Sequence, residues 1–303
     1  MGLSLFKKKQ NTNGCLNRLP NYLYRYYSLD EKYNKSQLDG CLYFSSPLKF
    51  NDLFDAQHEI VNNINDVGVN LKKVKRRLLE IGYTNPNEVV ETLKNSNQAE
   101  RIKMEIRKRQ LEKVGVCCFI NDPLSILMWA YYNENKGFCI EYDVREIEKQ
   151  LVRSFAEYLE KDEKFVLNRI SADAVKYQHS IPASSLFFNE NKPEKIVDKY
   201  FYKAKCWEHE HEYRIVLSLG GNALLSFKNI VKSITFGYNM PKSEIINILS
   251  IISKIDGYEE PKLYFLKKIR GLDALERVQY IISDDWASNI NDVLRDVERI
   301  RNL

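Results

Sequence analysis

The chain has 303 residues with a net charge of +5, and 44% of them are hydrophobic and 12% aromatic. This composition supplies enough apolar material for one large domain and excludes an intrinsically disordered chain. No run approaches the roughly 20 apolar residues of a membrane-spanning helix, so we expect no membrane partner. Six cysteines lack C-x-x-C spacing and no export signal precedes them, which predicts reduced thiols in the cytoplasm.

The pattern of apolar residues predicts mixed strands and helices along the chain. We expect strands at residues 22–27, 41–45, 115–120, 137–143, 212–219, 230–236, 262–268 and 277–282. We expect helices at residues 30–38, 70–82, from 88, 97–113, 124–132, 144–172, 243–254 and 286–303. Because these elements follow no regular βαβ rhythm, the sequence predicts an α+β fold with central mixed or antiparallel sheets.

The domain organisation follows from the polar segments between these elements. Residues 1–18 are expected to form a flexible leader, and residues 19–303 a single α+β domain that ends in a C-terminal helix. Residues 62–113 are expected to form a basic helical insertion within it. Residues 70–113 carry twelve Lys and Arg against six Glu and no Asp. These helices could contact nucleic acid or a protein partner, although a run of charge is more often a solvated helix face. The oligomeric state is not predicted.

The densest polar cluster lies at residues 207–214. If this segment is extended, successive side chains point to opposite faces. Glu210, Glu212 and Arg214 then share one face, where they could bind ribose hydroxyls or stabilise positive charge. The alternative is a solvated strand edge with a ladder of charges. His209 and His211 would share the other face as a metal dyad, but no third ligand with a clear spacing follows, so we predict no metal.

Further candidates lie earlier in the chain. Arg25 stands within the aromatic run at residues 22–27, where a buried guanidinium needs a carboxylate of the chain or a ligand phosphate. Trp129 and Tyr132 share a helix face and could stack on a ligand, although such pairs are more often core residues. The turn after residue 47 could position a ligand through polar side chains, or form an Asx turn.

Several blocks together resemble a large prokaryotic family of domains of unknown function, numbered 2971. They are residues 24–26, 42–47, 50–55, 118–119, 127–132, 136–142, 205–207, 210–215 and 234–237. The resemblance spans about residues 20 to 240 and depends on the order of the blocks. The family name implies no activity.

The strand from Glu210 to Val216 also resembles the catalytic strand of ADP-ribosyltransferases, in which an E-x-E pair can occur. This resemblance implies a split β core, NAD as the substrate, and a toxin or anti-phage defence effector. The implied catalytic residues are Glu212, foremost, and Glu210. The implied residues that bind NAD are Arg25, Tyr24, Tyr26, Ser45, Asn51, Asp52, Trp129, Tyr132 and Arg214.

Two other functions stay open at this point. In a metal-dependent nuclease, Asp52, Asp55, Glu210 and Glu212 would hold Mg²⁺ while the basic helices bind the phosphate backbone. In a non-enzymatic sensor, the basic insertion would bind nucleic acid or a partner, and the carboxylates would be dispensable.

Overall fold

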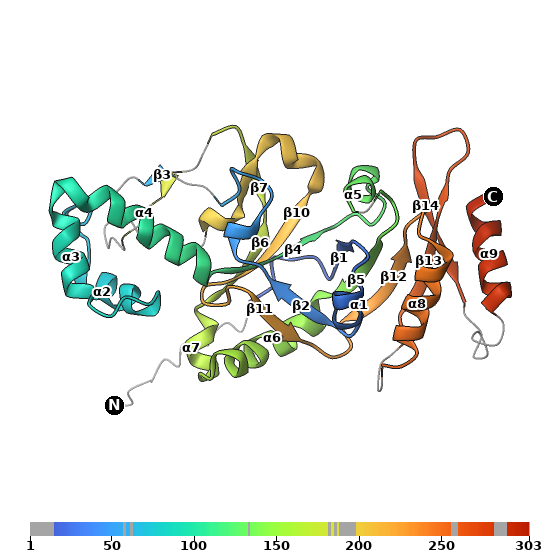
Figure 1. Ribbon diagram of the computed structural model, residues 1–303, viewed down its shortest axis with the longest axis horizontal. Helices are drawn as coiled ribbons and strands as arrows, with labels where there is room; N and C mark the ends of the chain where they lie inside the picture. Colours follow the sequence, from blue (N-terminus) through green and yellow to red (C-terminus); the bar gives the residue numbers. More distant parts are fainter. Residues whose placement is uncertain are drawn as a thin grey trace, which may run out of the picture.

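An eight-stranded mixed sheet forms the centre of the molecule (Figure 1). Its strand order is β14-β13-β12-β5-β1-β4-β10-β6, and all neighbours are antiparallel except β12 and β13. The strands are β1 (Tyr22–Tyr27), β4 (Gly115–Ile120), β5 (Phe138–Asp143), β6 (Ile170–Ala174), β10 (Glu212–Leu217), β12 (Val231–Phe236), β13 (Lys262–Lys268) and β14 (Leu275–Tyr280). The predicted α+β class is confirmed.

The computed structural model describes residues 15–56, 59–60, 63–132, 134–180, 183–184, 187, 198–255, 260–281 and 290–302. Residues 1–14 of the predicted leader lie outside the described residues. Its last residues differ from the prediction, because Leu16 is fully buried. The Leu16 amide donates to Glu148 at 2.6 Å, and its carbonyl accepts from Arg145 at 3.3 Å.

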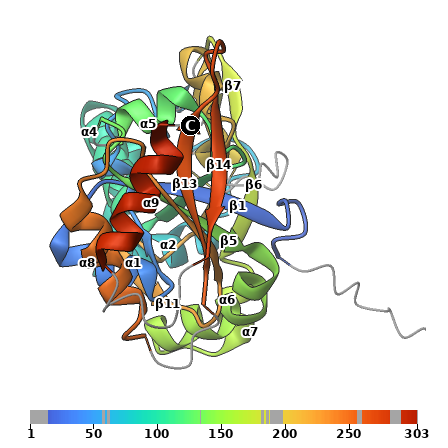
Figure 2. The same cartoon turned by 90° about the vertical axis from the view of Figure 1, so that its right-hand side faces the viewer.

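The main hydrophobic core lies on one face of the sheet, between its strands and a layer of helices (Figures 1 and 2). These helices are α1 (Glu31–Leu38), α6 (Val144–Leu159), α7 (Glu163–Leu167), α8 (Lys242–Ile252) and α9 (Ile290–Asn302). A ribbon of β2 (Cys41–Phe44) and β11 (Ala223–Ser226) packs into the same core. The opposite face is covered in part by α5 (Ile126–Tyr131), whose Met128 and Trp129 pack on Tyr26.

Shorter elements lie outside the central sheet. They are η1 (Pro47–Lys49), β3 (Glu59–Ile60), β7 (Lys176–Gln178), β8 (Ala183–Ser184), η2 (Asp198–Phe201), β9 (Tyr202–Ala204) and η3 (Lys205–Glu210). Their strands form two separate pairs, β3 with β8 and β7 with β9. The predicted helix over 144–172 is wrong at its end, because residues 170–174 form β6. Ile170 and Ala172 alternate towards the core, and β6 pairs with β10.

Three helices of the segment 62–113 project from one end of the sheet (Figure 1). They are α2 (Leu71–Glu80), α3 (Pro86–Lys94) and α4 (Ser96–Lys113). They share a small core of their own, to which Val74, Leu78, Val90 and Ile106 contribute. The Asn70 side chain caps α2 by accepting from the Lys73 amide at 3.0 Å. Among the described residues, no helix is long and apolar enough to cross a membrane.

The sheet opens between β1 and β4, two strands that are described in full. These two strands pair at one position, where Tyr24 lies opposite Ile120. By contrast, β1 pairs with β5 along its whole length. At the far end of β4, Val116 instead exchanges backbone hydrogen bonds with Ser45, at 2.9 and 3.0 Å. The resulting split positions the candidate site.

Candidate functional site

A cavity of about 580 Å³ occupies the split between β1 and β4. This volume lies in the range typical of sites for small molecules and cofactors. Its lining brings together eight of the residues predicted to form a site: Tyr24, Arg25, Tyr26, Ser45, Asn51, Tyr132, Glu210 and Glu212. Residues from β1, β4, α5, η3 and β10 therefore converge on one space.

Arg25 provides positive charge to this cavity without a carboxylate partner. Its Nη1 donates to the Cys117 sulfur at 2.7 Å and to the Tyr43 carbonyl at 3.4 Å. Its guanidinium carbon lies 5.3 Å from the centre of the Tyr27 ring. Among the described residues, no ion pair neutralises this guanidinium. The side chain is only partly buried, and an arginine stays charged at any pH a protein tolerates.

Aromatic rings form much of the remaining wall. Tyr26 and Tyr132 stack with their centroids 5.7 Å apart. Tyr131 and Trp207 also line the cavity, with their rings 6.4 Å apart. His209 lies beside both, at 6.1 and 6.0 Å. These flat surfaces suit the planar rings of a nucleotide.

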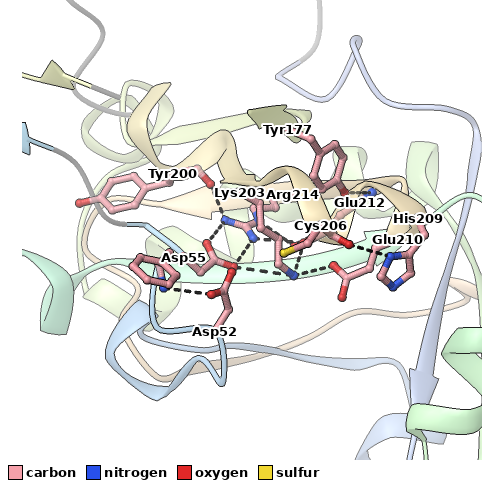
Figure 3. Close-up of polar contacts among 11 residues, drawn as sticks. Asp52, Asp55, Tyr177, Tyr200, Lys203, Cys206, His209, Glu210, Glu212 and Arg214 are labelled. Atoms are coloured by element: carbon pink, nitrogen blue, oxygen red, sulfur yellow. Dashed lines mark hydrogen bonds and ion pairs between the residues drawn. The ribbon is translucent and has the colours of Figure 1, made fainter. Parts of the chain in front are cut away.

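A network of ion pairs lies directly behind the cavity and is centred on Arg214 (Figure 3). Arg214 is fully buried. It donates to both oxygens of Asp55, at 2.8 and 2.7 Å, and to both oxygens of Glu212, at 2.7 and 3.1 Å. It also donates to the Tyr200 carbonyl at 2.7 Å. The guanidinium is thus paired on two sides, which fixes β10 against the segment that carries Asp55.

Lys203 joins this network to the cavity. Its Nζ lies 2.5 Å from Glu210, 3.3 Å from Glu212 and 3.9 Å from Asp55, and 4.9 Å from the Trp207 ring centre. Three carboxylates therefore share two cations, Lys203 and Arg214, which leaves one net negative charge. Glu210 carries the carboxylate oxygen that is free to act, because its Oε1 has no hydrogen-bond partner among the described residues.

The two glutamates have opposite pKa shifts. Burial alone would raise the pKa of Glu212, but Arg214 and Lys203 lower it to about 2. The pKa of Glu210 is raised, because burial outweighs the charge of Lys203. Burial, followed by the charge of Glu212, raises the pKa of the Cys118 thiol well above its usual value. Cys118 therefore stays protonated and donates a hydrogen bond to Glu212.

The backbone around Glu210 differs from the prediction. Residues 205–210 form the 3₁₀ helix η3, and His211 adopts a left-handed conformation with φ of 46°. The strand starts only at Glu212, whose amide donates to the Tyr177 hydroxyl at 2.8 Å. Strict alternation is therefore wrong before residue 212. Glu210 still lies beside Glu212, because Lys203 contacts both (Figure 3).

Three residues expected to bind the ligand do not line the cavity. Trp129 is fully buried and donates its indole N–H to the Pro123 carbonyl at 2.9 Å, so it is a core residue. Arg214 lies behind the cavity and binds Asp55 and Glu212. The Asp52 side chain accepts from the Phe54 amide at 2.9 Å and forms the Asx turn that was the alternative.

Two important residues were missed by the sequence reasoning. Lys203 lies in the short strand Tyr202–Ala204, and its carboxylate partners follow seven and nine residues later. The rule that identified Arg25, that a charge within an apolar run needs a partner, applies equally to Lys203. Cys118 was predicted only to be one of six reduced thiols, and no sequence pattern distinguishes it from Cys117.

The histidines do not form a metal site with the carboxylates. His211 is exposed, and the Nδ1 atom of His209 lies 3.1 Å from the Cys206 carbonyl. Across the described ranges, no group of three or more His, Cys, Asp or Glu side chains could hold a metal ion. The carboxylates instead surround Lys203 and Arg214.

Comparison with known proteins finds one family match and no activity. Residues 128–215 match the model of a family described as Protein of unknown function (DUF2971), which supports the predicted resemblance over that segment. The matched segment runs from α5 to β10 and contains Tyr132, Lys203, Glu210 and Arg214. Comparisons with curated proteins and with solved structures found no match.

Proposed function

We propose that the chain is an NAD-consuming enzyme, an ADP-ribosyltransferase or NAD glycohydrolase, with its active site in the split between β1 and β4. One observation carries the proposal: a single cavity is lined by an arginine without a carboxylate partner, Arg25, and by a carboxylate with one free oxygen, Glu210. A ligand that pairs with both residues must carry an anionic group for Arg25. It must also carry hydroxyls or positive charge for Glu210. NAD has all of these.

Arg25 is the expected site for the diphosphate. A guanidinium binds phosphate oxygens through paired N–H donors, and such charge-assisted bonds are stronger in a partly buried site. Lys49 lines the same cavity and donates to the Tyr43 hydroxyl at 3.0 Å, so a second positive charge is available. The ring of Tyr132, which stacks on the buried Tyr26, offers a surface for the nicotinamide or adenine.

Glu210 is the expected catalytic carboxylate. In the proposed reaction, the bond between the ribose C1′ and the nicotinamide nitrogen breaks, and nicotinamide leaves with the electron pair. The ribosyl group then carries positive charge, which the Glu210 carboxylate stabilises. Water or an acceptor nucleophile forms the new bond to C1′ and releases its proton to Glu210 or solvent. A raised pKa suits Glu210 to accept that proton.

Glu212 is the expected positioning residue, which reverses the order of importance predicted from the sequence. Both of its oxygens accept from Arg214, and Lys203 and Cys118 contact it as well. Few acceptor positions remain for a ribose hydroxyl. Through Lys203, Glu212 fixes the position of Glu210.

The geometry supports a metal-dependent nuclease less well. Asp55 and Glu212 do lie close together, as a shared Mg²⁺ site would require. However, Arg214 lies between them and binds both, and Asp52 is committed to its turn. A divalent cation at this position would have to displace or repel two buried cations.

The test is consumption of NAD by the purified chain, measured as nicotinamide release, with and without protein and nucleic-acid acceptors. We expect turnover in the wild type and its loss in Glu210→Gln. Glu208→Gln is the matched control, because Glu208 is on the same 3₁₀ helix but exposed and paired with Lys205 at 2.6 Å. The proposal fails if the wild type neither releases nicotinamide nor modifies any acceptor.

A further inference from the structure

Lys199 is a buried amine with almost no polar partner. It belongs to η2, next to the helical insertion, and is 5% exposed. Its Nζ lies 3.5 Å from the Gln110 side-chain oxygen, at the limit of a hydrogen bond, and 5.2 Å from the Tyr200 ring centre. No carboxylate among the described residues pairs with it.

The charged groups around Lys199 are also positive. Burial, followed by the charges of Arg77 on α2 and Arg107 on α4, lowers the pKa of Lys199 to about 7. The carboxylate of Glu80, on the same helix as Arg77, is shared between Arg77 at 3.0 Å and Arg169 at 2.7 Å. Glu80 therefore pairs with these two arginines and does not pair with Lys199.

The two other lysines that are buried in the described part of the chain both pair with carboxylates. Lys203 is 9% exposed and contacts three carboxylates. Lys103 is 7% exposed and pairs with Glu100 at 2.7 Å. Burying an ammonium without a counter-charge costs several kcal/mol. Lys199 lacks the partner that each of the others has.

We propose that Lys199, Arg77 and Arg107 form a second binding site, which takes a phosphate group where the helical insertion meets the sheet. The site is separate from the cavity in the split, because none of these residues lines that cavity. Arg77 and Arg107 are partly exposed, so an anion from solvent can reach the cluster. A phosphate oxygen would supply the counter-charge that Lys199 lacks.

Two sources carry this phosphate chemistry: free phosphate and a nucleic-acid backbone. The exposed Lys72, Arg76 and Lys108 on α2 and α4 would extend the contact along a backbone. The site does not depend on the proposed reaction with NAD. A phosphate site here would make the insertion a sensing element attached to the same domain.

The test uses the full chain with Arg25→Met, which removes the arginine proposed to bind anions in the cavity. Thermal unfolding is measured with and without inorganic phosphate in this parent, after adding Lys199→Met or, as control, Lys94→Met. Lys94 is exposed on α3 and pairs with Glu91 at 2.8 Å. We expect phosphate to raise the melting temperature of the parent and the control by about 2–4 °C, the shift produced by roughly 1 kcal/mol, and to leave Lys199→Met unchanged.

A fold defect in the variant is separable from loss of binding. Without phosphate, Lys199→Met should be at least as stable as its parent, because it removes an unpaired buried charge. The proposal is overturned if phosphate stabilises Lys199→Met as much as the parent, or if phosphate stabilises neither.

A short DNA duplex in the same variants distinguishes the two sources. If the backbone is the ligand, Lys199→Met weakens duplex binding about tenfold, the effect of losing 1.4 kcal/mol. If duplex binding is unchanged while the phosphate effect is lost, a small phosphate is the ligand. If neither depends on Lys199, the site does not exist.

Discussion

Arg25 and Arg214 are two arginines on strands that flank β4, and they have opposite environments. Arg214 is fully buried and binds Asp55, Glu212 and a backbone carbonyl. Arg25 is partly buried and binds a thiol and a distant carbonyl. The paired arginine holds the fold together. The unpaired one faces a cavity, and we propose that an anionic ligand is its missing partner.

The largest expected effect on stability comes from removing the paired arginine, Arg214. Arg214→Met would leave Asp55 and Glu212 buried without their main cation, and we expect the free energy of unfolding to fall by about 3–5 kcal/mol. Urea denaturation measures this. Arg18→Met is the control, because the Arg18–Asp173 pair is exposed and should contribute less than about 1 kcal/mol. Equal losses in the two variants would show that the network around Arg214 adds nothing.

The second prediction distinguishes the catalytic role proposed for Glu210 from the positioning role proposed for Glu212. Glu210→Gln should lower turnover about 10²–10³-fold, the usual cost of removing one electrostatic contact to the transition state. Its stability should change little. Glu212→Gln should cost about 1–3 kcal/mol of stability, because it leaves Arg214 and Lys203 partly unpaired. If Glu212→Gln instead abolishes turnover in a fully stable protein, Glu212 is the catalytic carboxylate.

The third effect is on acid unfolding. The pKa of Glu212 is about 2 when folded, below its value of about 4.3 in an unfolded chain. The stabilisation from its charge is complete above the unfolded value and is lost as pH falls towards 2, a loss on the order of 3 kcal/mol. Glu210, whose pKa is raised, opposes this trend. Between pH 4.5 and 2, the free energy of unfolding should fall less steeply with pH in Glu212→Gln than in the wild type. Equal slopes in the two proteins would contradict the account.

The smallest expected effect on stability comes from removing the unpaired arginine, Arg25. Arg25→Met should change the stability by less than about 1 kcal/mol, because no carboxylate loses its partner. Urea denaturation of this variant beside Arg214→Met measures the comparison directly. A loss as large as that of Arg214→Met would assign Arg25 to the core.

The sequence predicted the strands that carry the site better than it predicted the roles of the residues. The aromatic run around Arg25 identified both β1 and a charge in need of a partner. Glu212 and Arg214 share a face as alternation predicts, since both lie on β10. Glu210 lies on a 3₁₀ helix, where alternation fails.

The remaining features depend on contacts that no local pattern contains. Asp55 is 159 residues from Arg214 in sequence, and only the fold brings them to 2.8 Å. The i, i+3 spacing of Trp129 and Tyr132 is the same whether the pair faces a ligand or the core. The structure divides them: Tyr132 lines the cavity and Trp129 is buried.

The most direct test of the central claim is calorimetric binding of ADP-ribose to the wild type, Arg25→Met and Lys49→Met. ADP-ribose contains the diphosphate and ribose that the cavity is proposed to hold, and it needs no turnover. We expect binding to the wild type and a loss of about 10–100-fold in Arg25→Met, since a hydrogen bond to a charged group contributes about 1.5–3 kcal/mol. The loss in Lys49→Met should be smaller. Equal affinity in the wild type and Arg25→Met, or no binding to either, would contradict the account.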